Sequence, residues 1–137
     1  MRKFRGMVVL AVGVLAAFSA GLAAGQRSAP HDDHLVEQTL LTTIDLAKAV
    51  GRLGDRELRM SRVTVASNGH IGLHSHKDDP TVAYIIDGTL INYHDDGTTE
   101  ALHAGQAYAE FGRKPHWVEN KGSTAATFIF ASVSRRQ

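Results

Sequence analysis

The 137-residue sequence contains no cysteine, so the fold uses no disulfide and no thiolate serves as nucleophile or metal ligand. It has no basic stripe with interleaved aromatic residues. The 15 Lys and Arg residues are balanced by 14 Asp and Glu residues, so the formal net charge is +1. A nucleic-acid partner is therefore not expected. A Gly-x-Ser-x-Gly element and a phosphate-binding glycine loop are also absent, which removes the reactions that those motifs mark.

The sequence has a single long apolar run, and it lies at the N-terminus. Arg2, Lys3 and Arg5 precede an uncharged stretch from Met7 to Phe18, and small residues follow up to position 25. This order predicts a secretory signal peptide over residues 1–25, cleaved after Ala23 or after Gly25, and a periplasmic or secreted protein. The alternative is an uncleaved N-terminal membrane anchor, because the uncharged run approaches the length of a membrane span. Only in that case do we expect contact with a membrane.

The remainder is long enough for one domain, which we place at residues 39–137. Residues 26–38 are polar and lack a sustained period, which predicts a flexible lead-in. His31 and His34 in this stretch are interpreted as solvated linker residues and not as a metal-binding tail. Residues 39–45 fit a strand, although the apolar positions from Leu40 to Val50 also fit a helical period.

From residue 56 onward, short apolar segments alternate with turn signals at intervals of about eight to twelve residues. The pattern predicts eight or nine strands and no long helix, which excludes a parallel α/β fold. Asp95, Asp96 and Gly97 predict a tight hairpin, because Asp-Gly readily adopts positive φ angles. We therefore expect an all-β fold built as an antiparallel sandwich or barrel.

Histidines are concentrated in this region, since three of the eight lie within seven positions. His74 and His76 are two residues apart on a predicted strand, so their side chains point to the same face. Two imidazoles on one face form half of a metal site. His70, His94 and His103 are interpreted as surface or hydrogen-bonding residues without a ligand role.

Two spacings give the chain a family resemblance over about residues 56–133, the motif-bearing part of the predicted domain. The first spacing is a glycine, a His-x-His element and a later glycine, formed by Gly69, His74, His76 and Gly88. The second is a glycine, ten residues, a histidine, three residues and an asparagine, formed by Gly105, His116 and Asn120. Together they resemble the two motifs of a small single-domain cupin.

The resemblance implies an antiparallel jelly-roll barrel with a divalent transition metal held by His74, His76 and His116. Iron is favoured, and Zn, Mn, Ni and Cu are the alternatives, because neutral imidazole binds all of these borderline metals. Thr81 stands where the family usually has a glutamate ligand. The site is therefore either a neutral three-histidine centre, which we favour, or a centre that recruits Glu110 as a fourth ligand. Asn120 is expected to orient a ligand histidine or to bond the barrel backbone.

These features predict an exported metal-binding protein that binds a small organic molecule. One hypothesis is a non-heme metal-dependent dioxygenase or a related oxidoreductase. The alternative is a non-catalytic module that binds a small ligand or the metal alone, and the sequence leaves this choice open. We also expect a homodimer, since an interface supplements the core of a small mature chain.

Overall fold

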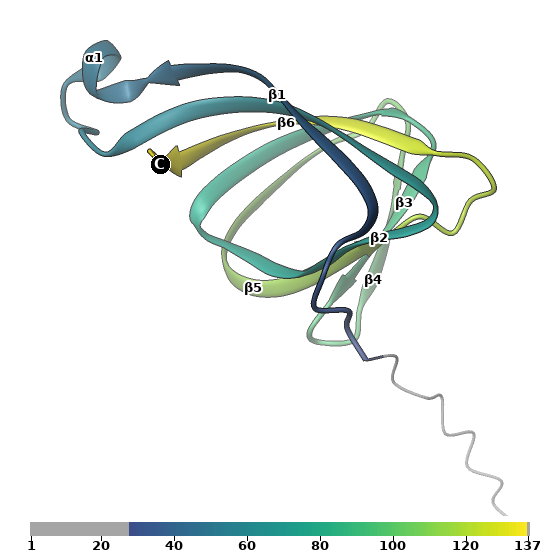
Figure 1. The fold of residues 1–137 in the computed structure, drawn as a ribbon. Coiled ribbons are helices and arrows are strands. Elements are labelled where there is room, and N and C mark those ends of the chain that lie inside the picture. Colours follow the sequence, from purple (N-terminus) through teal and green to yellow (C-terminus); the bar gives the residue numbers. More distant parts are fainter. Residues whose placement is uncertain (1–27, 137) are drawn as a thin grey trace, which may run out of the picture.

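The computed structural model describes residues 28–136, so the predicted signal peptide 1–25 and the first two residues of the predicted lead-in lie outside the described residues. The described chain is nearly all antiparallel β-structure, which confirms the predicted fold class (Figure 1). Among these residues, no helix has both the length and the apolar character needed to cross a membrane. The elements in chain order are β1 (His34–Asp45), α1 (Leu46–Val50), β2 (Arg56–Asp87), β3 (Thr89–His94), β4 (Thr99–His103), β5 (Ala107–Glu119) and β6 (Ala126–Arg135).

Strand β2 organises the fold because it changes partners along its 32 residues. Residues 56–65 pair with β1 on one side and with β6 on the other. Residues 70–76 pair with β5, and residues 81–87 pair with both β5 and β6. The predicted turns inside this range appear as register shifts within one continuous strand. The described residues, β1 included, therefore form six strands where eight or nine were predicted.

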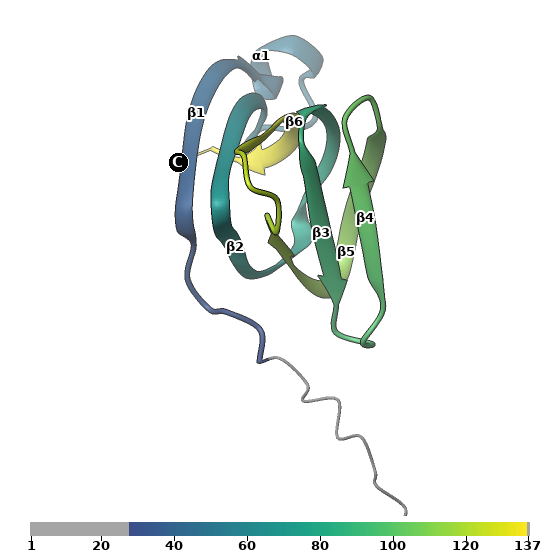
Figure 2. The same cartoon turned by 90° about the vertical axis from the view of Figure 1, so that its right-hand side faces the viewer.

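The long strands β2 and β5 curve around the interior, so that parts of one sheet face each other (Figures 1 and 2). The strand order is β1-β2-β5-β3-β4, and β6 pairs with β2. The arrangement matches a jelly roll, as predicted, but the sheet is not closed into a barrel. Within the described chain β4 pairs only with β3 and β1 only with β2, so these two strands remain edges.

The core lies between the facing parts of the sheet. Ser61 and Val63 are buried whereas Arg62 between them is exposed, as expected when successive strand residues point to opposite faces. Side chains from β2, β3, β4, β5 and the start of β6 meet in one cluster. Its buried members are Val63, Val65, Ala83, Ile85, Leu90, Leu102, Val118, Ala126 and Phe128.

The predicted hairpin is confirmed between β3 and β4. Tyr93 pairs with Thr99, and Gly97 adopts a φ of 83° in the turn between the strands. The Asp96 carboxylate accepts hydrogen bonds from the backbone N–H and the hydroxyl of Thr98, which fixes the turn.

The first strand begins earlier than predicted, because His34 to Gln38 belong to β1 and not to a flexible lead-in. A backbone ladder with residues 63–70 of β2 orders this stretch, which is a long-range interaction that local polarity does not reveal. The helical period found between Leu40 and Val50 is explained by the short helix α1, which follows the predicted strand 39–45 directly.

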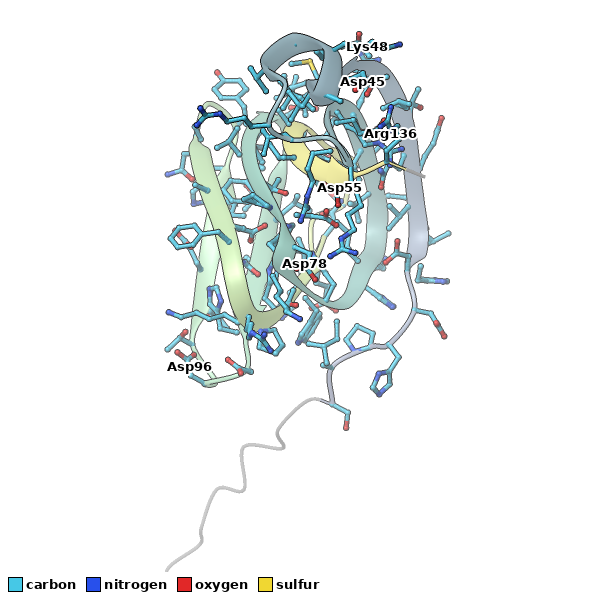
Figure 3. All side chains as sticks on the ribbon, turned by 90° about the vertical axis from the view of Figure 1, so that its left-hand side faces the viewer. Asp45, Lys48, Asp55, Asp78, Asp96 and Arg136 are labelled. Atoms are coloured by element: carbon cyan, nitrogen blue, oxygen red, sulfur yellow. The ribbon has the colours of Figure 1, made fainter. Side chains whose placement is uncertain are left out.

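Charged side chains join the end of β1 to the C-terminal end of β6 (Figure 3). Asp45 caps α1 by accepting a hydrogen bond from Ala47 N at 3.0 Å. The same carboxylate accepts from Arg136 Nη1 at 2.7 Å, and Lys48 Nζ lies 3.7 Å from it. These contacts hold the segment after β6 against the end of β1, on the side of the molecule where α1 lies.

Candidate metal centre

The predicted histidines come together where β2 pairs with β5. His74 and His116 are direct partners across the two strands, and His76 follows two residues after His74 on the same face. One ring nitrogen of each of the three residues lies within 4.8 Å of those of the other two. Their ring centroids are 4.2 to 5.2 Å apart. The structure thus brings together the three residues predicted as ligands.

Hydrogen bonds fix how the two β2 imidazoles present their nitrogens. His74 Nδ1 lies 2.7 Å from the carbonyl oxygen of Gly72, which only accepts, so Nδ1 carries the proton. His76 Nδ1 lies 3.1 Å from the carbonyl oxygen of Asp79 and 3.0 Å from Thr81 Oγ1. Thr81 donates its own proton to Asp79 O, so its hydroxyl oxygen accepts from His76. In their neutral form both rings therefore have the lone pair on Nε2.

The orientation of His116 follows from a chain of three side chains. An ionised Glu110 only accepts, so Asn92 Nδ2 must donate to Glu110 Oε1, 3.2 Å away. The Asn92 amide oxygen then faces His116 Nδ1 at 2.8 Å, which makes Nδ1 the donor. His116 Nε2 is left with a lone pair, like the other two rings.

The chemistry of these three ring nitrogens fits a divalent metal. Neither Nε2 of His76 nor Nε2 of His116 has a hydrogen bond of acceptable geometry within the described chain, and both atoms are buried. Buried lone pairs without a donor are unfavourable unless a cation binds them. Three neutral imidazoles whose opposite nitrogens are hydrogen-bonded are typical of a metal centre with oriented ligands.

Glu110 lies beside the three histidines. Its Oε2 is 3.0 Å from His76 Nε2, and its Oε1 is 3.2 Å from His116 Nδ1. It does not belong to the group whose ligand atoms all lie within 4.8 Å of one another. The carboxylate therefore flanks the histidine cluster, and its role as a ligand stays a prediction.

The electrostatics of the site follow from burial and from this carboxylate. Burial lowers the pKa of His76, but the Glu110 hydrogen bond and charge outweigh it and hold the pKa above its usual 6.5. Burial lowers the pKa of His116 to about 4, because Glu110 compensates only in part and the neighbouring histidines lower it further. Burial raises the pKa of Glu110, but the three histidines lower it more, so the carboxyl stays ionised. Below the raised pKa of His76, a proton at its Nε2 therefore faces Glu110 in the metal-free site.

The histidines face a cavity of about 510 Å³ between the facing parts of the sheet. The wall opposite them is apolar near the core, where Val63, Phe128 and Phe130 lie, and polar farther out, where Arg59, Ser132 and Ser134 lie. A second cavity of about 210 Å³ borders His76, His116 and Glu110 from the side of Phe111 and Lys114. Cavities thus border His76 and His116 on two sides.

The segment before β1 packs against the site through Gly72. Leu73 N donates to Pro30 O at 2.7 Å, and Gly72 N donates to Asp33 Oδ1 at 2.8 Å. A Cβ atom at Gly72 would lie 2.6 Å from His31 O, so only glycine allows this approach. The carbonyl of the same glycine binds His74, and residues 31 and 33 line the large cavity.

Asn120 does not lie against the histidines. Its side chain donates to Val65 O and Thr124 O and accepts from Gly122 N, so it holds the turn after β5. The role of orienting a ligand falls to Asn92, which the sequence reasoning missed. Alternation along β3 was a usable signal, since Asn92 shares the buried face with Leu90 and a buried amide requires partners.

The histidines outside the predicted ligand set stay outside the cluster. His94 is the Cα partner of His116 on β3, with ring centroids 6.3 Å apart, but it does not join the ligand group. His103 bonds the hydroxyl of Thr89 on the β3–β4 hairpin, and His70 lies against His34.

Comparison with known proteins gives one family and several similar structures. A family model described as the cupin domain matches residues 61–132. Among solved structures, a predicted oxalate decarboxylase from Thermotoga maritima is 21% identical, with a TM-score of 0.57 over 72% of this chain and 80% of that one. The polyketide cyclase RemF from Streptomyces resistomycificus is 20% identical, with a TM-score of 0.61 over 78% and 70%. A recombinant oxalate oxidase in complex with glycolate is 24% identical, with a TM-score of 0.56 over 75% and 53%. No curated protein matches the chain in sequence.

Proposed function

Because the chain belongs to the cupin family, we propose that it holds one divalent transition metal at His74, His76 and His116 and acts as an oxidoreductase on a small organic acid. The observation that carries this proposal is the set of three Nε2 lone pairs, each fixed by an acceptor on the opposite ring nitrogen. Two similar structures are named for oxalate, a small dicarboxylate, which supports an acidic substrate.

Iron is the metal we propose. Imidazole ligands suit Fe, Zn, Cu and Ni, and three of them leave coordination positions open for exogenous ligands. Ferrous iron in such a site supplies electrons for dioxygen chemistry and a Lewis acid for a chelating substrate. Three neutral ligands leave the full charge of the ion in place, which favours an anionic substrate in a partly desolvated cavity.

The protein's own groups have separable tasks in this proposal. Asn92 and the Gly72 carbonyl hold His116 and His74 in orientation, and Thr81 does so for His76. Below the raised pKa of His76, Glu110 holds a proton at His76 Nε2, which the metal would replace. Val63, Phe128 and Phe130 exclude water from one side of the cavity.

The test is an anaerobic preparation analysed for metal content and then for oxygen uptake with candidate small acids. We expect about one equivalent of iron in the wild type, loss of metal in His74→Ala and His116→Ala, and retention in the control His103→Ala. A full equivalent of metal in His74→Ala would contradict the ligand set. Redox-silent zinc without oxygen uptake would instead favour a non-catalytic binding module.

We also propose that the protein is exported, on the basis of the N-terminal sequence alone. Intact-mass analysis of the mature protein is expected to give an N-terminus after Ala23 or Gly25. Recovery of a peptide that spans both junctions from the mature protein would contradict processing at either site.

A further inference from the structure

The register of the strands places four polar side chains in one row across the inner face of the sheet. Glu110 on β5 pairs with Thr81 on β2, and Thr81 pairs with Ser132 on β6. Ser132 in turn pairs with Arg59 in the first part of β2. All four line the large cavity. The row therefore leads from the histidine cluster directly to an arginine.

The next inward-facing row nearer the core is mixed and consists of Ser61, Phe130 and Ala83, and the row after it is apolar. There, Ile85, Phe128 and Val63 are direct partners across the same three strand segments, and all are buried. Polar side chains facing a cavity are unfavourable unless they meet water or a polar ligand. A small molecule bound in the cavity would thus have one apolar side and one polar side.

Arg59 is the only lysine or arginine among the described residues that line this cavity. Arg59 forms an ion pair with Glu57 on the same strand, in which Arg59 Nε lies 3.5 Å from Glu57 Oε1. A guanidinium has five N–H donors arranged to bind a carboxylate in a bidentate manner. Because the Glu57 contact uses Nε, the terminal nitrogens can bind an anion in the cavity.

Two of the three carboxylates that line the cavity are engaged by the protein. Glu110 contacts His76, His116 and Asn92, and Asp33 accepts from Gly72 N. Along the sheet, Glu110 and Arg59 are three strand spacings apart, about 14 Å, and the curvature of the sheet makes the direct distance shorter. The two side chains together with a short acid of five or six carbons are long enough to fill this separation.

We infer that Arg59 binds the distal carboxylate of a small organic acid whose other end chelates the metal. The inference rests on the proposed function, because it requires a metal at the three histidines. It assigns the substrate class as short dicarboxylic acids with a chelating group at one end, and it makes Arg59 the residue that selects the second acidic group.

The test uses protein loaded with Co(II), whose visible absorption changes when an acid chelates the ion. The probes are 2-oxoglutarate and 2-oxopentanoate, which share the chelating 2-oxo acid and differ in the distal carboxylate. A second pair, 2-oxoadipate and 2-oxohexanoate, is one carbon longer and tests a greater distance between the metal and Arg59. Arg59→Gln removes the positive charge of Arg59 from the cavity. The control, Arg62→Gln, removes an exposed positive charge from the opposite face of the same strand.

In the wild type we expect at least one diacid to bind tighter than its matched monoacid by about ten- to a hundredfold, the range for a hydrogen-bonded charge pair. Arg59→Gln should abolish that preference while leaving monoacid binding and Co(II) stoichiometry unchanged. Arg62→Gln should retain the preference. Equal binding of diacids and monoacids by fully loaded wild type, or a preference that survives in Arg59→Gln, would overturn the inference alone. Wild-type protein that binds no stoichiometric Co(II) would overturn the proposed function and the inference with it.

Discussion

Thr81 and Glu110 are direct partners in the pairing of β2 with β5, and they contact opposite nitrogens of His76. Thr81 Oγ1 lies 3.0 Å from Nδ1, and Glu110 Oε2 lies 3.0 Å from Nε2. The position where the family resemblance implies a glutamate ligand thus holds a hydroxyl, and a carboxylate lies opposite it on the adjacent strand. Its effect on the site is therefore exerted through His76.

The first prediction concerns the pH dependence of metal binding. The raised pKa of His76 means that the ion pair with Glu110 stabilises the metal-free protein below the usual pKa of 6.5, and that this stabilisation is lost as pH rises through the raised value. Metal must displace this proton, so the metal affinity should increase with pH up to the raised pKa. His116, with a pKa of about 4, adds no such dependence near neutral pH.

Replacing Glu110 by Gln separates the two models of the site. Without the carboxylate, burial dominates and the pKa of His76 falls, so the midpoint of metal binding should move to lower pH while one equivalent still binds. Zn(II) titrations over a pH series measure this shift. Loss of stoichiometric metal at all pH values in Glu110→Gln would show that the carboxylate is an inner-sphere ligand.

The second prediction tests the hydroxyl on the other side of His76. Thr81→Val keeps the shape of the side chain but removes an acceptor for His76 Nδ1, while Asp79 O remains at 3.1 Å. Since one of two acceptors is lost, the metal affinity should fall by about tenfold, the lower end of the range for partners of metal ligands. Thr81→Ser retains the hydroxyl and should bind metal like the wild type. Equal affinities in the Val and Ser variants would contradict this role.

The third prediction contrasts two buried asparagines. Asn92→Leu removes the hydrogen-bond partner of His116 Nδ1 while Glu110 Oε1 remains 3.2 Å away, so metal affinity should fall by about tenfold or more. Asn120→Leu leaves two backbone carbonyls and one N–H without their partner, so the free energy of unfolding should fall by roughly 2 kcal/mol or more, with metal stoichiometry retained. Metal titration and chemical denaturation of both variants distinguish the roles. Metal loss caused by Asn120→Leu in folded protein would contradict the assignment.

The sequence predicts those parts of the site that depend on local alternation. His74 and His76 share a face because they are two residues apart, and the Asp95–Gly97 turn is determined by local φ preferences. The roles of Asn92 and Gly72 are harder to predict, because their partners His116 and Asp33 lie 24 and 39 positions away in the chain. The continuity of β2 through its predicted turns depends on pairing with β5 and β6, which is likewise a long-range effect.

The last prediction tests whether the segment before β1 supports the metal centre. In Gly72→Ala the new Cβ would meet His31 O at 2.6 Å, so the segment must move away and the bonds from Gly72 N and Leu73 N are lost. We expect the free energy of unfolding to fall by about 1 to 3 kcal/mol. Proteolysis within residues 28–33 should become faster, and metal affinity should fall because the Gly72 carbonyl orients His74.

Gly54→Ala is the matched control for this substitution. A Cβ atom at Gly54 meets nothing within 4 Å, and the residue does not have a positive φ, so its stability should change by no more than about 0.5 kcal/mol. Denaturation, limited proteolysis and metal titration of both variants form the experiment. If Gly72→Ala behaved like Gly54→Ala in all three measurements, the segment would be a passive neighbour of the site. A loss of stability with unchanged metal affinity would show that the segment stabilises the fold without positioning His74.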